Sequence, residues 1–216
     1  MKGTRLLAAC LAFGIAGLAG FSAPAEAAPE VPKNVFQWVQ SSARTNFYFN
    51  KQQMHYAFNA DGVIDTNVLV VPVLLTYDDI QIDDIISKRR WRGDSLEGYN
   101  ALAGAAEYLR IDKAARTVTI TQHDELDDTW SVLSSNKEKK VIKLDDLSEK
   151  NLDRSFYERI LKYADTHAAA LLASTEAKLT PEQKAKAAQI KADEEKAAAE
   201  KAAQEKKGKK HKHHKK

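Results

Sequence analysis

The last part of the chain has almost nothing to bury, and this limits where a fold can form. Between Lys184 and Lys207 the apolar residues are alanines and the single Ile190. A helix with so little apolar surface gains little from packing, so we expect it to project into solvent. A hydrophobic core must therefore come from the residues that precede it.

The start and the end of this projecting helix both have signals in the sequence. Thr180, Pro181 and Gln183 combine a capping hydroxyl, a proline in the first turn and a capping-box glutamine. Glycine is a poor helix former, so we expect the helix to end at Gly208. Residues 178–207 are thus predicted to be a solvent-exposed helical stalk, and residues 208–216 a disordered tail of lysine and histidine.

Charge is divided unevenly along the chain. Residues 178–216 carry 13 lysines against 6 acidic residues, whereas the preceding residues carry 20 basic against 24 acidic residues. An acidic body is therefore followed by a basic tail. Polyanions should attract that tail through forces that salt weakens.

The tail predicts two classes of partner. Its lysines predict binding to anionic envelope polymers or lipid headgroups, without specific recognition of nucleic acid; they are Lys206, Lys207, Lys209, Lys210, Lys212, Lys215 and Lys216. Its histidines are His211, His213 and His214, and neutral imidazoles favour zinc, nickel or copper ions. A tail that only keeps the protein in solution remains a third interpretation.

The first 27 residues have the pattern of a secretory signal peptide. Lys2 and Arg5 precede the apolar run from Leu6 to Phe21, and small residues lead to Ala27, where we expect cleavage. An uncleaved membrane anchor would need about 20 apolar residues. The predicted location is the periplasm or the cell surface, with no transmembrane segment after cleavage.

A lipoprotein cleavage site is the alternative at this end of the chain. Leu7-Ala8-Ala9-Cys10 has the required residue pattern, but only four residues separate Cys10 from Arg5. An export signal needs an apolar segment of about 7 to 15 residues, so we favour cleavage after Ala27. Cys10 is the only cysteine, and its removal excludes disulfides and thiolate sites from the mature chain. We expect no cofactor.

Residues 28–177 have the patterns of an α+β domain with a small antiparallel sheet and several helices. Helical spacing predicts helices over 34–44 and 78–90, from about Asp94 onward, and over 148–174. Alternation and apolar runs predict strands over 47–58, 68–75, 107–111, 116–122 and 130–133, with a turn over 59–62. Strands between helices without regular alternation indicate the α+β class.

Two details of these strands are specific enough to test. Leu109 and Ile111 should face Val118 and Ile120 across a hairpin. Pro72 removes a hydrogen-bond donor, which favours an edge strand or a bulge, and a helix broken at this proline is the alternative.

Gly93-Asp94-Ser95-Leu96 matches a hydrolase signature. These four residues resemble those of GDSL-type esterases, and the resemblance would make Ser95 the nucleophile. That family also needs an Asp-x-x-His pair, and no histidine of this chain has an aspartate three residues before it. The same residues fit a turn at Gly93 and a cap at Asp94, which we favour. The overlapping Arg92-Gly93-Asp94 is an adhesion tripeptide that recurs by chance.

Other polar motifs fit ordinary structural roles better than a site. Residues 59–65 resemble the middle of an EF-hand loop, but Ala57 and Val68 would stand at its ligating ends, so we expect a turn. Paired acidic residues at 78–79, 83–84, 124–125, 127–128 and 145–146 could serve acid–base chemistry, yet caps and loops use them equally well. His55, His123 and His167 stand singly.

The patterns together favour an exported, non-enzymatic protein of the cell envelope. Its body would be a binding or scaffolding module, and its cationic end would contact anionic envelope polymers. Metal binding through the tail histidines is one alternative. A hydrolytic enzyme with its site among the acidic loops is the other.

Overall fold

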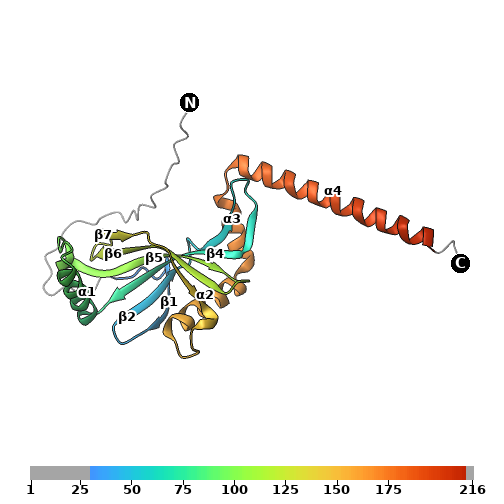
Figure 1. Cartoon of the computed structure of the whole chain (residues 1–216). Helices are drawn as coiled ribbons and strands as arrows, with labels where there is room; N and C mark the ends of the chain where they lie inside the picture. Colours follow the sequence, from blue (N-terminus) through green and yellow to red (C-terminus); the bar gives the residue numbers. More distant parts are fainter. Residues whose placement is uncertain (1–29, 213–216) are drawn as a thin grey trace.

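A computed structural model describes residues 30–212. The predicted signal peptide and the last four residues lie outside that range. The described chain folds as an α+β structure around one antiparallel sheet, as the sequence predicts (Figure 1). The sheet has eight strands: β1 (Phe36–Ser41), β2 (Thr45–Asn50), β3 (His55–Phe58), β4 (Ile64–Tyr77), β5 (Leu102–Asp112), β6 (Thr117–Asp127), β7 (Val132–Asn136) and β8 (Lys140–Lys143).

The strands follow the order β1-β2-β4-β5-β6-β7, with β3 beside β4 and β8 beside β6. Four α-helices accompany them: α1 (Asp79–Arg92), α2 (Leu152–Thr166), α3 (Ala168–Lys178) and α4 (Pro181–Lys212). Helices α2 and α3 lie against one face of the sheet, whereas α4 extends away from it (Figure 1). None of the helices in the described part of the chain is long and apolar enough to cross a membrane.

The main core lies between the sheet and α2 with α3. Fully buried residues of the central strands, such as Val71 and Ile111, meet Phe156 and Ile160 of α2 and Leu171 of α3. A second, smaller cluster on the opposite face joins Phe36, Leu74, Ala106 and Leu126. Because both faces are covered near the middle of the sheet, β4 and β5 are apolar on both sides.

The hairpin predicted from alternation is confirmed. Leu109 pairs with Ile120 and Ile111 pairs with Val118, so the four side chains share the face toward the helices. The turn over residues 59–62 is also confirmed, because Asn59 accepts backbone hydrogen bonds from Asp61 and Val63, both at 3.0 Å. Gly62 completes it with a positive φ of 80°, which glycine adopts without strain.

Residues 68–75 form part of β4, but β4 is a central strand rather than the expected edge. Pro72 is tolerated there because of its neighbours. On one side β2 pairs only as far as Val73, and β3 starts at Val70, so Pro72 lies opposite the gap between these strands. On the other side Pro72 faces Tyr108. The carbonyl of Tyr108 accepts a hydrogen bond from the hydroxyl of Thr121 on β6, so it does not need the N–H that proline lacks.

The helix predicted over residues 34–44 is wrong, since this segment contains β1. Phe36 and Val39 have helical spacing, but an odd spacing in a strand puts side chains on opposite faces. Phe36 accordingly packs in the small cluster and Val39 in the main core. The strand predicted over 47–58 is two strands, β2 and β3, separated by a turn that the buried Asn50 caps.

The helix predicted from about Asp94 is also wrong. The chain forms a loop and one 3-10 turn, Tyr99–Ala101, before β5 begins at Leu102. A strand buried on both faces has a continuous apolar sequence, which resembles a buried helix in composition. The strand predicted over 130–133 is β7, displaced toward the C-terminus, with Trp130 in the preceding turn.

The helix predicted over residues 148–174 is interrupted at His167, which separates α2 from α3. The hydroxyl of Thr166 donates to the carbonyls of Lys162 and Tyr163, and side chains that bond the preceding turn compete with the helical pattern. The break redirects α3, so that Leu171 and Thr175 are buried against the sheet.

Helix α4 begins as predicted, with the reciprocal bonds of a capping box between Thr180 and Gln183. It is assigned through Lys212 and thus continues past Gly208, where we expected it to end. Its contact with the body is confined to the first turns. Gly62 lies so close to the Gln183 backbone that a Cβ would come within 2.6 Å of the carbonyl oxygen, and Lys186 pairs with Asp61 at 3.6 Å.

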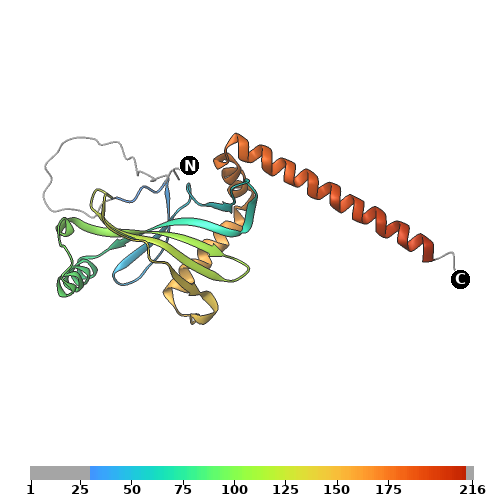
Figure 2. The same cartoon turned by 45° about the horizontal axis from the view of Figure 1, so that its top comes forward.

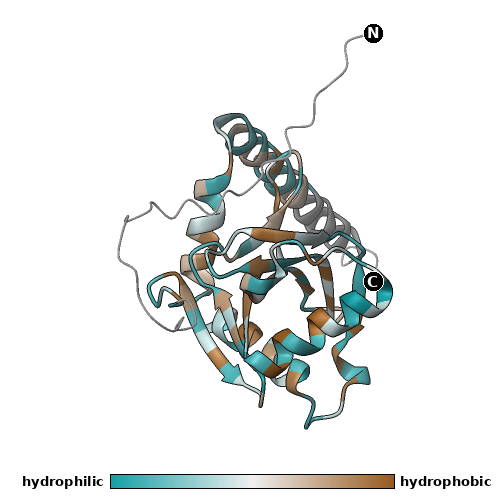
Figure 3. Cartoon of the chain, turned by 90° about the vertical axis from the view of Figure 1, so that its left-hand side faces the viewer, coloured by the Kyte–Doolittle hydropathy of each residue, from teal (hydrophilic) through white to brown (hydrophobic). Residues whose placement is uncertain are grey.

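Helix α1 lies at the end of the sheet opposite α3 and α4, as both Figure 1 and Figure 2 show. The aspartate-rich start and basic end predicted from the sequence are present, and Asp78 caps the first turn. Ile82, Ile85 and Ile86 are only half-buried, and no residue of α1 is fully buried. Figure 3 faces this end of the molecule, where hydrophilic and hydrophobic residues alternate along the helix.

Candidate functional site

The predicted polyanion site lies at the far end of α4. The structure puts the backbone of Lys206, Lys207, Lys209, Lys210 and Lys212 in one helical segment. Lys215 and Lys216 lie outside the described residues. The stretch before this segment, from Lys191 to Glu200, is exposed at every position, so α4 leaves the body without packing on it (Figure 1).

The predicted metal site is described only in part. His211 lies in the last turn of α4, and His213 and His214 lie outside the described residues. Among the residues whose side chains the structure describes, no group of three histidine, cysteine, aspartate or glutamate side chains converges. Binding of zinc, nickel or copper by the tail thus stays a prediction.

The hydrolase signature is part of a loop after α1. Ser95 is exposed, and its Oγ accepts a hydrogen bond of 3.2 Å from the backbone N–H of Glu97. No described histidine forms a hydrogen bond with Ser95, so the described residues hold no assembled Ser–His pair. Arg92 and Asp94 of the adhesion tripeptide bond to each other at 2.8 Å.

Several of the paired carboxylates have local structural partners. Asp78 caps α1, and Asp127 accepts the backbone N–H groups of Thr129 and Ser131. Asp124 is almost fully buried and is held by the amide of Gln122. These residues do not form a common cleft of opposed carboxylates.

A polar cluster that the sequence did not reveal lies on the helix-side face of β5 and β6. Glu107 and His123 are cross-strand partners, and their side chains bond at 3.0 Å between Oε1 and Nδ1. The hydrogen bond to Glu107 raises the pKa of His123, and the nearby carboxylates add to this effect. The pair favours the protonated imidazole, and no described hydroxyl bonds to His123.

The second half of this cluster ties α1 to the sheet. Glu125 accepts from Arg89 at 3.2 Å and from the hydroxyl of Tyr99, and the Arg89 guanidinium lies 4.1 Å from the centre of the Tyr99 ring. Burial, followed by the hydrogen bond to Glu125, raises the pKa of Tyr99 to about 12. Burial also raises the pKa of Tyr77, and Glu107 and Glu125 contribute to the shift. Arg89 and Glu125 therefore form an ion pair that holds α1 against the sheet, and the phenols of Tyr77 and Tyr99 beside it stay neutral.

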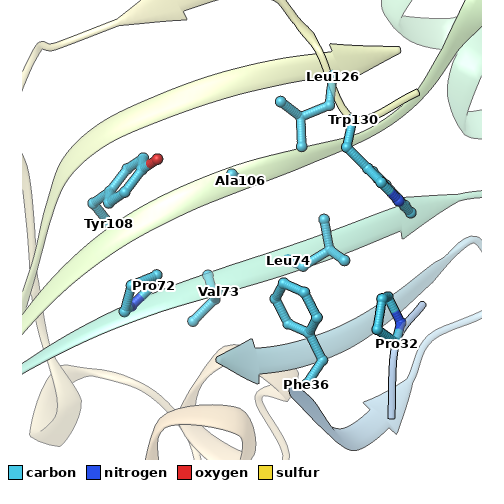
Figure 4. Close-up of a pocket in the computed structure, with 9 residues that line it drawn as sticks. All are labelled: Pro32, Phe36, Pro72, Val73, Leu74, Ala106, Tyr108, Leu126 and Trp130. Atoms are coloured by element: carbon cyan, nitrogen blue, oxygen red, sulfur yellow. The ribbon is translucent and has the colours of Figure 1, made fainter. Parts of the chain in front are cut away.

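The most apolar hollow lies on the other face of the sheet (Figure 4). Side chains from β1, β4, β5 and β6 line it together with the segment before β1 and the turn before β7; they are Pro32, Phe36, Pro72, Val73, Leu74, Ala106, Tyr108, Leu126 and Trp130. Its cavity volume is about 20 Å³. A cavity of about 10 to 15 Å³ holds one water molecule, so the hollow has room for about one water molecule and for no larger ligand.

Comparison with models of protein families, with curated proteins and with solved structures finds no match to this chain.

Proposed function

We propose that this chain is an exported, non-enzymatic protein of the cell envelope, in which a compact body presents a cationic helix to anionic envelope polymers. The observation that carries the proposal is the exposure of α4 after its first turns. A helix held away from the body keeps its lysines available to an external partner.

The charge distribution supports the same conclusion. The body is acidic and could neutralise the basic helix if the two were in contact. Among residues whose side chains the structure describes, Lys186 and Asp61 form the single ion pair between α4 and the body. Exposed ion pairs contribute about 0 to 1 kcal/mol, so this pair does not hold the helix against the body.

The chemistry of the partner follows from the type and number of charges. Lysine is a strongly hydrated point charge that binds phosphate without strict geometry. Near an anionic surface each lysine contributes about 1 kcal/mol, and this falls off within a Debye length. We infer phosphate-bearing polymers of the envelope as the partner, bound with little selectivity and released by salt.

The test compares three forms of the full chain on immobilised lipopolysaccharide. In the first variant Lys206, Lys207, Lys209, Lys210, Lys212, Lys215 and Lys216 become glutamine, and in the second they become arginine. Lysine, glutamine and arginine have similar helix propensities, so α4 is preserved in both. We expect the wild type and the arginine variant to bind at about 0.05 M salt and to dissociate as salt rises, and the glutamine variant to bind at least about tenfold more weakly. Equal binding of all three would contradict the proposal.

A further inference from the structure

The C-terminal end of α1 exposes a tryptophan between two arginines. Trp91 is 89% exposed, the highest value among the large hydrophobic residues of the described chain. Arg90 and Arg92 flank it and are exposed as well. A single exposed apolar residue is common on protein surfaces, so it is the two exposed arginines beside the indole that make this helix end unusual.

The last turn of α1 is held in place, so Trp91 is presented in a fixed direction. Arg89 binds Glu125 and stacks on Tyr99, and its guanidinium also donates twice to the carbonyl of Ser95 at 3.0 and 3.1 Å. Two residues along an α-helix are separated by about 200° around the axis. Since Arg89 faces the sheet, Trp91 faces away from it.

The charges around Trp91 are available to an anionic partner. Arg90 forms no ion pair with any other described residue. Arg92 pairs with Asp94 at 2.8 Å and Lys88 with Asp84 at 2.6 Å, but both pairs are exposed. Exposed pairs contribute little, so they exchange for phosphate groups at low cost. The aspartates of α1 lie on earlier turns, and Asp94, which follows the last turn, is paired with Arg92.

We propose that this end of α1, defined by Lys88, Arg90, Trp91 and Arg92, docks on a bilayer that contains anionic phospholipids. Tryptophan prefers the boundary between headgroups and acyl chains because its ring is amphipathic. Arginines beside it bind the lipid phosphates in a bidentate manner. This contact goes beyond the proposed function, because α1 and α4 lie at opposite ends of the body (Figures 1 and 2). One molecule therefore has two separate anionic contacts.

The experiment uses the mature chain with the seven tail lysines changed to glutamine, so that binding through the tail does not mask α1. Vesicles contain phosphatidylcholine and phosphatidylglycerol in equal parts, and co-sedimentation gives the partition constant. Trp91→Ala should weaken partition about tenfold, because the indole, once inserted into the bilayer, supplies most of the apolar contact. The combined Arg90→Gln and Arg92→Gln variant should weaken it as strongly and remove the preference over pure phosphatidylcholine.

Trp38 supplies the matched control, since it is 52% exposed on β1 and away from α1. Trp38→Ala should partition as its parent does. The indole emission should shift to shorter wavelength on vesicles, and this shift should vanish in Trp91→Phe. Equal partition of Trp91→Ala and its parent, or an equal loss in Trp38→Ala, would overturn the proposal. A failure of membrane docking by α1 can be told apart from a failure of polyanion binding by the tail, because lipopolysaccharide binding by the wild-type chain is measured separately.

Discussion

Glu107 and His123 form a proton-holding pair whose effect on stability should depend on pH. Glu107 raises the pKa of His123 in the folded chain above its usual value, so the charged pair stabilises the fold below about pH 6.5. This contribution is lost as the pH rises through the folded pKa. Glu107→Gln should therefore cost more at about pH 5.5 than at about pH 8.5.

The difference should be below about 1 kcal/mol, because the side chain of His123 is 35% exposed and solvent screens the pair. Urea unfolding of both proteins at the two pH values measures it. A cost that is the same at both values would mean that the pair does not hold a proton in the folded chain.

Gly104 is the described glycine at which an added methyl group would come closest to neighbouring backbone. A Cβ on it would lie 2.1 Å from the carbonyl oxygen of Leu75 on the neighbouring strand. Backbone cannot move aside without breaking the pairing of β4 and β5, so we expect Gly104→Ala to lower the free energy of unfolding by about 3 kcal/mol. Chemical denaturation provides the measurement.

Gly93→Ala is the control for this substitution. Gly93 has a φ of 75° but nothing within 4 Å of its Cβ position, so it reports the cost of the backbone conformation without a clash, about 1 kcal/mol. If Gly104→Ala were no more costly than Gly93→Ala, the close approach of the two strands would be wrong.

At the scale of elements, the capping box fixes the beginning of α4. Thr180→Ala removes the acceptor for the Gln183 N–H, which should weaken the first turn by about 1 kcal/mol. Hydrogen exchange of the amides in this turn should speed up accordingly, and exchange in β5 should not change. Thr180→Ser retains the hydroxyl and should behave as wild type. Unchanged exchange in Thr180→Ala would argue against the capping box.

The sequence predicts an element correctly where its local residue pattern fits only one kind of secondary structure. The β5–β6 hairpin and its facing residues follow from alternation, and α1 and the start of α4 follow from their caps. The strand β1 and the start of β5 could not be predicted in this way. Their apolar residues are buried on both faces of the sheet, which removes alternation and leaves spacing that a helix also satisfies.

The polar cluster could not be predicted for a different reason. Glu107, His123 and Glu125 share a face only because of the register between β5 and β6, which includes two bulges. Register is set by tertiary packing as well as by the turn. The exposure of Trp91 could not be predicted either. The sequence shows that an apolar residue lies on a helix, but it does not show whether another segment of the chain covers that residue.

At the scale of the whole molecule, the body and the stalk should be energetically independent. Residues 191–200 of α4 are exposed, and Lys186 forms the one described ion pair between α4 and the body. Changing the seven tail lysines to glutamine should leave the free energy of unfolding within about 0.5 kcal/mol of wild type. Urea unfolding at low salt tests this, and a clear loss of stability would mean that the tail contacts the body.

Helix α4 stands away from an acidic body, and small-angle X-ray scattering of the mature chain can measure this separation in solution. A helix of 32 residues is about 48 Å long. We predict a distance distribution with a long extension beyond the body, which is the same at about 0.05 M and about 0.5 M salt. A compact distribution at low salt that lengthens as salt rises would show that the lysines pair with the protein's own carboxylates. In that case α4 would not be a stalk held away from the body.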